Sequence, residues 1–313
     1  MEQVPTNSAK AWLLASRPKT LAAAITPVVV GCALAYSQNS FSLIPALICL
    51  LFAVLMQVAA NLINDLIDYK KGSDGEERLG PMRATAQGWI TPDAMKAGIC
   101  AVVATACLIG LSILYFTTWK LVLVGLACVV FAYLYTSGPY PLSYNGWGDV
   151  AVVVFFGIVP VCMTCYVQTG TCPAYGIWLS IAVGLAINSL LVVNNYRDRE
   201  TDKASGKRTI IVKLGEPFGR YFYLANGVAA TLIGTAALYC ALQSQDNQQE
   251  ASGARNLLTA AVLLLPYLLL HTTTWRKLCA IREGRALNTL IGQSSRNMLV
   301  YAILTTIGLT ICK

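Results

Sequence analysis

The chain has 313 residues, of which 56% are hydrophobic and 12% are charged. A soluble domain carries about 25% charged residues, so this composition excludes an ordinary soluble enzyme and predicts a membrane protein with several spans. The apolar segments run almost continuously from Leu21 to Ile311 and leave no polar block long enough for a separate domain. We therefore expect one integral membrane domain over residues 1–313.

The apolar segments predict an all-α fold with nine transmembrane helices, because a helix needs about 20 apolar residues to cross a bilayer. Their expected ranges are 20–36, 42–64, 94–116, 119–136, 149–168, 174–196, 219–242, 256–272 and 295–312. The first apolar run is followed by eight others, so we interpret it as a retained span and not as a cleaved signal peptide.

The loops between these spans differ in their positive charge. With the N-terminus in the cytoplasm, twenty of the 23 Lys and Arg residues lie on the cytoplasmic side, and only Lys120, Arg255 and Lys313 lie outside. Positive residues concentrate in cytoplasmic loops, so this distribution supports both the count of nine and the orientation. The formal net charge of +8 follows from topology, and we predict no nucleic-acid partner.

Polar side chains gather at the cytoplasmic end of the second span. Asn61, Asn64, Asp65 and Asp68 are spaced i, i+3, i+4, i+7, which places them on one face of a helix. They lead into a cytoplasmic loop at about residues 65–93. The basic residues near or in this loop are Lys70, Lys71, Arg78 and Arg83.

The end of the sixth span repeats this arrangement. Asn194, Asp198 and Asp202 follow at i, i+4, i+8, and we expect them on one helical face at the start of a loop at about residues 196–219. The basic residues of this loop include Lys203, Lys207 and Arg208. Two such sites, four helices apart, indicate two half-bundles that face each other across a cavity, with the two cytoplasmic loops as its cap.

The residue types at both sites suit a metal ion and a phosphate. Carboxylate and amide oxygens are hard ligands of the kind that Mg²⁺ prefers, and Mg²⁺ completes its coordination with water and substrate phosphate. Acids and bases together therefore favour a Mg²⁺–diphosphate site over the alternative, in which they form only surface ion pairs. A diphosphate ester of a long isoprenoid would keep its tail in the bilayer and its head at this site, which indicates prenyl transfer.

Four motifs connect this interpretation to a known family. They are RPKTL at Arg17–Leu21, NDLIDYKKGSDGEERLGPMR at Asn64–Arg83, YTSGPYPLSYNGWGD at Tyr135–Asp149 and NNYRDRETDKASGKRTI at Asn194–Ile210. With these motifs the chain resembles the UbiA superfamily of intramembrane aromatic prenyltransferases. Gly72 stands where the general pattern NDxxDxxxD has its last Asp, and the nearby acid is Asp74, as in the branch that prenylates 1,4-dihydroxy-2-naphthoate.

The resemblance implies a Mg²⁺-dependent enzyme with nine helices around a central cavity. The implied metal ligands are Asn64, Asp65, Asp68, Asn194, Asp198 and Asp202. The implied diphosphate-binding residues are Arg17, Lys70, Arg78, Arg83, Lys203, Lys207 and Arg208. Asp68 and Asp202 are the candidate catalytic residues, because a carboxylate near the acceptor would assist loss of the naphthol proton.

The implied reaction transfers a polyprenyl group from polyprenyl diphosphate to 1,4-dihydroxy-2-naphthoate. CO₂ and diphosphate are lost, and the product is demethylmenaquinol for menaquinone biosynthesis in the cytoplasmic membrane of a bacterium. One alternative is an enzyme of the same superfamily with another aromatic acceptor, such as 4-hydroxybenzoate. A second is a cation or phospholipid transporter, which would place its acids near the middle of the membrane. The sequence does not determine prenyl chain length, the number of Mg²⁺ ions or oligomeric state.

Tyrosines and cysteines leave further alternatives open. Four tyrosines around a Gly-Pro turn either line the acceptor pocket or, as we favour, belong to the interfacial aromatic belt. They are Tyr133, Tyr135, Tyr140 and Tyr144.

The eleven cysteines are scattered, and Cys162 and Cys165 form the only CxxC. With a single histidine in the chain they offer no convincing zinc ligand set, so we expect inert buried thiols.

Overall fold

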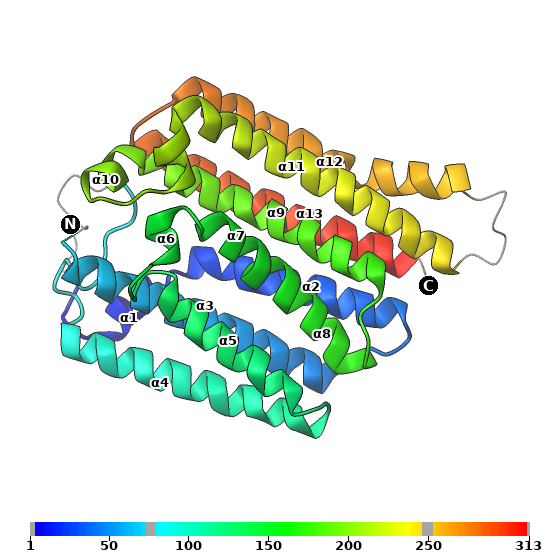
Figure 1. Ribbon diagram of the computed structural model, residues 1–313, viewed down its shortest axis with the longest axis horizontal. Helices are drawn as coiled ribbons and strands as arrows, with labels where there is room; N and C mark the ends of the chain where they lie inside the picture. The colour runs from blue at the N-terminus through cyan, green and yellow to red at the C-terminus, as the bar shows by residue number, and fades with distance from the viewer. Residues whose placement is uncertain (1–3, 73–78, 246–252, 312–313) are drawn as a thin grey trace.

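The computed structural model describes residues 4–72, 79–245 and 253–311, and every regular element in these ranges is a helix (Figure 1). The long helices are α2 (Pro18–Ser37), α3 (Leu43–Lys70), α4 (Pro92–Leu111), α5 (Lys120–Leu134), α9 (Ala174–Arg197), α11 (Ile210–Gln245), α12 (Gly253–Ile281) and α13 (Asn288–Ile311). The shorter elements are α1 (Ala9–Ser16), η1 (Ser112–Tyr115), α6 (Leu142–Asn145), α7 (Gly148–Val153), η2 (Val154–Ile158), α8 (Val159–Thr169), α10 (Arg199–Ala204) and η3 (Arg285–Leu287).

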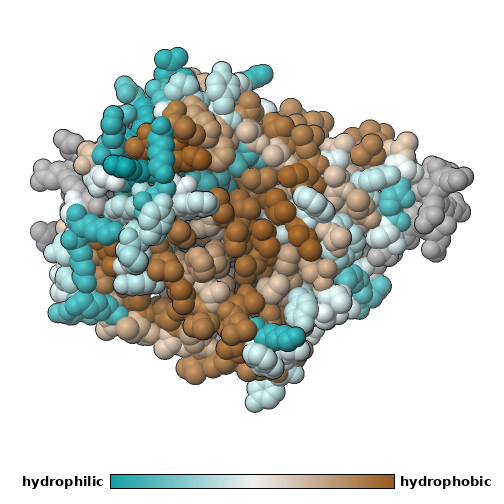
Figure 2. All heavy atoms as spheres, viewed as in Figure 1, coloured by the Kyte–Doolittle hydropathy of each residue, from teal (hydrophilic) through white to brown (hydrophobic). Residues whose placement is uncertain are grey.

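The length and hydropathy of these helices are those of a multi-pass membrane protein. Seven helical segments of the described chain are long and apolar enough to cross a bilayer, and α5 is apolar but has only 15 residues. Figure 2 shows a broad hydrophobic band across the middle of the molecule, with hydrophilic residues gathered at the end where α10 lies. The predicted all-helical membrane class is confirmed, and each of the nine predicted ranges overlaps a helical segment.

One end of the bundle carries the short helices α1, α6 and α10, and α13 ends at the opposite end (Figure 1). Local sequence explains where helices begin at this polar end. Ser8 caps α1 by accepting the N–H of Ala11, and Thr91 caps α4 in the same way. Pro18 and Pro92 occupy the first turn of their helices, where no intrahelical N–H bond is lost.

Polar bonds between α11, α12 and α13 hold the interior of the bundle together. The ring of His271, the single histidine of the chain, stacks on Tyr223 with 4.3 Å between centroids, and its Nε2 donates to the Tyr223 carbonyl at 2.9 Å. The Tyr301 hydroxyl donates to the Ala230 carbonyl at 2.8 Å. Such bonds associate helices in lipid, where apolar contact alone gives little driving force.

The segment from α7 to α8 contains one widened turn, the π-helical η2. Pro160 follows it and has no N–H to bond the preceding turn, which accounts for the change in helical pitch. Gly157 in η2 lets this segment approach α9 closely: a Cβ there would lie 2.6 Å from the Cα of Gly184 and 2.6 Å from the Ser180 carbonyl oxygen. The helix packing therefore requires glycine at position 157.

We expect Gly157→Ala to destabilise the protein by about 1–3 kcal/mol, because the added methyl group would force two backbones apart. Gly292→Ala in α13 is the matched control, since a Cβ at Gly292 meets no atom within 4 Å. Thermal unfolding in detergent measures both variants. Equal midpoints for the two variants would contradict the close packing of η2 on α9.

Candidate active site

A cavity of about 1810 Å³ lies inside the bundle and has a polar and an apolar part. Its polar lining is at the end of α3 and α9, and includes Asn64, Asp68, Asn194 and Asp198. Its apolar lining extends along α3 to Ile48, twenty residues before Asp68, which is about 30 Å at 1.5 Å per residue. The cavity therefore joins a charged mouth to an apolar channel as long as a bilayer core is thick.

Asp68 lies at the centre of the polar side chains at the end of α3. It is 2% exposed, and its Oδ2 accepts a hydrogen bond from Nη2 of Arg83 at 2.7 Å. Its Oδ1 accepts a hydrogen bond from the Tyr144 hydroxyl at 3.1 Å. Because α3 continues to Lys70, Asp68 lies in the last turn of a rigid helix and points into the cavity mouth.

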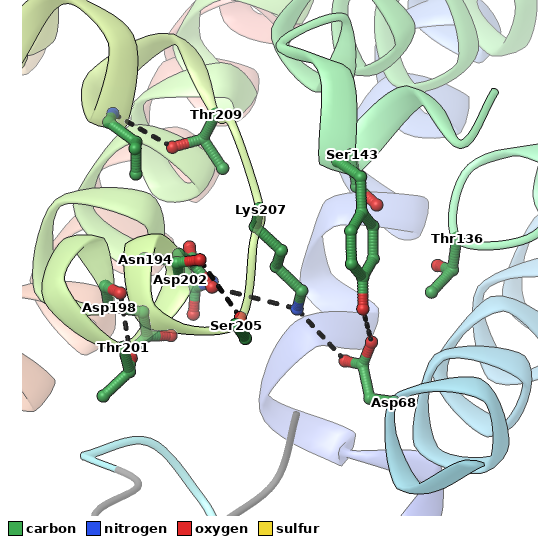
Figure 3. A network of polar contacts seen from close by, with 12 residues as sticks. Asp68, Thr136, Ser143, Asn194, Asp198, Thr201, Asp202, Ser205, Lys207 and Thr209 are labelled. Atoms are coloured by element: carbon green, nitrogen blue, oxygen red, sulfur yellow. Dashed lines mark hydrogen bonds and ion pairs between the residues drawn. The ribbon is translucent and has the colours of Figure 1, made fainter. Parts of the chain in front are cut away.

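Lys207 connects the two acidic motifs. Its Nζ lies 3.5 Å from Oδ2 of Asp68 and 3.8 Å from Oδ1 of Asp202, so one ammonium group bridges the end of α3 and α10 (Figure 3). The Tyr144 ring lies under two ammonium groups, at 4.9 Å from Lys207 and 3.8 Å from Lys71. Burial lowers the pKa of Lys71, and Lys207 adds to this effect while Asp68 opposes it.

Asp198 is held by its neighbour Arg197. Nε of Arg197 donates to Oδ1 of Asp198 at 2.7 Å, and Nη2 donates to Oδ2 and, at 2.8 Å, to Oδ1 of Asn194. Nη1 donates to Asn288 at 2.8 Å, and the Asn288 amide donates to the Leu79 carbonyl at 2.9 Å. Arg197 is 2% exposed, so its guanidinium makes these bonds from a largely desolvated position.

The prediction that Asn194, Asp198 and Asp202 share one continuous helical face is wrong. Helix α9 ends at Arg197, and Asp198 has φ −91° and ψ 5°, so the chain turns before α10 begins. The Asp202 N–H still bonds the Asp198 carbonyl at 2.7 Å, which keeps both carboxylates near the mouth. The turn directs Asp202 toward Lys207 while Asp198 stays beside α9 (Figure 3).

Asp65 has different surroundings from Asp68. Its two carboxylate oxygens accept the backbone N–H groups of Ala84 and Thr85, each at 2.9 Å, and the residue is 1% exposed. It does not line the cavity. Asp65 therefore fixes the loop that carries Arg83, whereas Asn64 lines the cavity and accepts a hydrogen bond from the Thr136 hydroxyl.

The predicted diphosphate-binding residues divide into two groups. Arg17, Arg83 and Lys207 line the cavity. Lys70, Lys203 and Arg208 are exposed and do not line it. Arg78 lies outside the residues that the structure describes, as does Asp74.

Sequence reasoning missed Arg197 and assigned Tyr144 to the wrong environment. Arg197 was placed among the cytoplasmic charges, although its position between Tyr196 and Asp198 in a motif was a usable signal. Tyr133 and Tyr140 are exposed, as an interfacial belt requires, but Tyr144 bonds Asp68 and Tyr135 lines the cavity. Burial raises the pKa of Tyr135, and nearby carboxylates, Asp149 foremost, add to this effect.

The carboxylate and amide oxygens at the mouth are of the type that binds Mg²⁺. The cavity is lined by carboxylate and amide oxygens from both motifs, which are hard ligands. In the described ranges, no three His, Cys, Asp or Glu side chains are clustered closely enough to hold a metal ion by themselves. This is compatible with Mg²⁺, which binds one or two carboxylates and takes its other ligands from water and phosphate.

Comparison with known proteins identifies the family. The model of the UbiA prenyltransferase family matches residues 24–277. The chain belongs to this family. Its curated relatives include a protein of Escherichia coli (strain K12) named 1,4-dihydroxy-2-naphthoate octaprenyltransferase, 37% identical over 229 residues, which are 71% of this chain and 74% of that protein. A Mycobacterium leprae protein of the same name is 34% identical over 74% of this chain and 80% of its own.

The fold agrees with this assignment. A UbiA homolog from Archaeoglobus fulgidus, solved with DMAPP and Mg²⁺, superposes with a TM-score of 0.67 at 13% identity, covering 96% of this chain and 99% of that one. At this identity the match supports the fold alone. The predicted superfamily, and with it the class of prenyltransferase enzymes, is confirmed by the family match and the curated relatives.

We expect Asp65→Asn to lower the free energy of unfolding by about 1–3 kcal/mol, because an amide can accept only one of the two backbone N–H bonds and leaves the other donor unpaired. Thermal unfolding of the purified protein measures the change. A variant as stable as the unchanged protein would show that Asp65 does not support the loop.

Proposed function

We propose that this protein is a Mg²⁺-dependent prenyltransferase that joins a polyprenyl group to 1,4-dihydroxy-2-naphthoate, with loss of CO₂ and diphosphate, and so makes demethylmenaquinol for menaquinone biosynthesis. The observation that carries the proposal is the cavity, whose acidic and basic mouth continues into an apolar channel about 30 Å long. A polyprenyl diphosphate has the same division into a charged head and an apolar tail. The names of the curated relatives support this acceptor.

The proposed topology has nine spans, with α5 and α13 added to the seven longer and more apolar segments. The N-terminus and the two cap loops, at about residues 65–93 and 196–219, lie in the cytoplasm. The uneven distribution of Lys and Arg supports this orientation. The protein would then act as one domain in a bacterial cytoplasmic membrane, with its polar mouth open to cytoplasmic substrates.

The proposed metal ligands are the cavity-lining members of the two motifs: Asn64, Asp68, Asn194, Asp198 and Asp202. Asp65, also predicted as a ligand, is proposed instead to hold the loop in place, because its oxygens bond that loop. Bound Mg²⁺ would supply stabilisation of the negative charge that develops on the departing diphosphate.

The chain's own cations act on the same charge. Arg83 and Lys207 stand beside Asp68, Arg197 stands beside Asp198, and Arg17 lines the cavity nearby. The paired carboxylates hold Arg83 and Arg197 in fixed positions, so they need little reorganisation when charge develops. Asp68 accepts hydrogen bonds or ion pairs from Arg83, Tyr144 and Lys207. We assign removal of the naphthol proton to Asp202, the other predicted catalytic carboxylate at the mouth.

The transporter alternative fits less well. A transporter would place its acids midway along the spans, whereas Asp68, Asp198 and Asp202 all lie at one end of the cavity. An enzyme of the same family with another aromatic acceptor would share every motif residue. That alternative is a matter for experiment.

The acceptor is tested with membranes that contain the protein, a polyprenyl diphosphate and Mg²⁺. We expect turnover with 1,4-dihydroxy-2-naphthoate, and a product mass that shows both the added prenyl group and the loss of CO₂. Membranes without the protein are the control. Turnover of 4-hydroxybenzoate in the absence of any activity on dihydroxynaphthoate would overturn the proposed acceptor.

We expect Asp202→Asn to lower the turnover rate by about 10²–10⁴-fold, since an amide cannot take up the naphthol proton and a general base contributes a factor of this size. Glu200→Gln is the matched control, because Glu200 lines the same mouth but its side chain is 79% exposed. Both variants should unfold at the same temperature as the unchanged protein. Full activity of Asp202→Asn would remove this residue from the site.

A further inference from the structure

A polar cluster lies in the cavity wall, about two helical turns along α3 from the mouth residue Asn64. Thr20, Gln57 and Asn61 line the cavity together. On α3, Gln57, Asn61, Asn64 and Asp68 follow at i, i+4, i+7 and i+11, so they share one face of the helix. Gln57 precedes Asn64 by about 10 Å at 1.5 Å per residue. The cluster therefore lies between the charged mouth and the apolar channel.

A backbone carbonyl fixes the orientation of the Asn61 amide. Its Nδ2 donates to the Ser16 carbonyl at 2.9 Å and to Oγ1 of Thr20 at 3.1 Å. A carbonyl oxygen only accepts hydrogen bonds, so the nitrogen of this amide has to face Ser16. The Thr20 hydroxyl donates its own proton to the Arg17 carbonyl at 2.9 Å. Oδ1 of Asn61 therefore faces the other way, toward Gln57.

The Gln57 amide is oriented in turn by these two neighbours. Its Nε2 donates to Oδ1 of Asn61 at 3.3 Å and to Oγ1 of Thr20 at 3.4 Å. With the amide reversed, Oε1 would face two oxygens that have no proton to donate to it. Oε1 is therefore directed away from the cluster. Among the described residues this oxygen is buried and accepts no hydrogen bond.

The unpaired oxygen of Gln57 is not needed to hold helices together. The bonds of Asn61 already join α3 to the end of α1 and to α2, which is the usual task of polar side chains between membrane helices. A buried acceptor without a donor is unfavourable, and a ligand that supplies the donor removes this cost.

The Gln57 amide can meet such a ligand from the cavity. Its two hydrogen bonds, at 3.3 and 3.4 Å, are longer than those of Asn61, so it is the more weakly held of the two amides. The last torsion of a glutamine side chain is also broad. Because the same side chain lines the cavity, a small rotation brings Oε1 to a bound molecule.

The substrates of the proposed function differ in what they offer this oxygen. The tail of a polyprenyl diphosphate has no hydrogen-bond donor, whereas 1,4-dihydroxy-2-naphthoate has two hydroxyls. Its 1-hydroxyl stands beside the carboxylate and can bond it internally, so the 4-hydroxyl is the free donor. Cations such as Arg83 and Lys207 attract the carboxylate toward the mouth, which leaves the 4-hydroxyl on the side of the cluster.

We infer that Gln57 binds the aromatic acceptor, with Oε1 accepting a hydrogen bond from the 4-hydroxyl of 1,4-dihydroxy-2-naphthoate. Thr20 and Asn61 hold the amide in the orientation that this bond needs. The inference rests on the proposed function. The 1-hydroxyl, next to the carbon that takes the prenyl group, is then left on the side of the mouth, which Asp202 lines.

Equilibrium binding to the purified full-length chain in detergent tests this hydrogen bond. Calorimetric titration without oxygen gives the dissociation constants of 1,4-dihydroxy-2-naphthoate and of 1-hydroxy-2-naphthoate, which lacks the 4-hydroxyl. We expect the unchanged protein to bind the dihydroxy compound about 3–10-fold more tightly, the factor that one hydrogen bond supplies. In Gln57→Met, which replaces the amide by an apolar group of similar length, we expect equal dissociation constants.

Two further variants separate this role from a general effect on the fold. Thr20→Val removes a hydroxyl that orients the Gln57 amide and should reduce the preference for the dihydroxy compound. Gln168→Met on α8 is the matched control, because Gln168 does not line the cavity and its Oε1 already accepts the Ser42 N–H at 3.0 Å. It should keep the full preference. Equal binding of both compounds by the unchanged protein would contradict the inference.

Turnover distinguishes this inference from the proposed function. Suppose that the unchanged protein converts dihydroxynaphthoate and that Gln57→Met and Thr20→Val keep the full binding preference. The role of Gln57 is then overturned and the proposed function stands. If membranes with the protein convert another aromatic acceptor but not dihydroxynaphthoate, the proposed function is overturned and the inference with it.

Discussion

A charge inside a membrane protein must be paired, and this constraint determines the polar end of the bundle. Asp68 and Arg83 are 2% and 6% exposed, and their ion pair measures 2.7 Å. Arg197 is equally buried and holds Asp198 and Asn194. Removal of one partner from such a pair costs about 3–5 kcal/mol, because the other charge stays buried without compensation. The loop after α3 and the turn after α9 are therefore fixed by the charges they carry.

The same pairing explains how two distant segments form one mouth. Each acidic motif pairs one carboxylate with its own arginine, Asp68 with Arg83 and Asp198 with Arg197. Lys207 then lies between Asp68 and Asp202 and links the halves across the cavity. The remaining wall of the cavity is largely apolar, which separates a charged end from an apolar end. This separation, more than any single residue, is what suits the cavity to a prenyl diphosphate.

Hydropathy and motifs predicted the helical membrane fold and placed Asn64, Asp68, Asn194 and Asp198 at one cavity. These predictions needed only local periodicity and span length. Periodicity could not show that Asp65 faces a loop, because the same face of α3 contacts both the loop and the cavity. It also could not show the turn at Asp198, which continues the sequence pattern of a helix. The burial of Arg197 depends on Asn288, almost a hundred residues away, and no local pattern contains that contact.

The motif residues cannot select the acceptor, because they bond one another and face the charged end of the cavity. On the proposed function, selection falls to the side chains between mouth and channel, where the reacting carbon would lie. Tyr135 lines the cavity, and its hydroxyl can donate to an acceptor oxygen. Phe155 and Phe156 lie in η2 and also line the cavity. Acceptor choice would then depend on η2 and on the end of α5, which lie outside both acidic motifs.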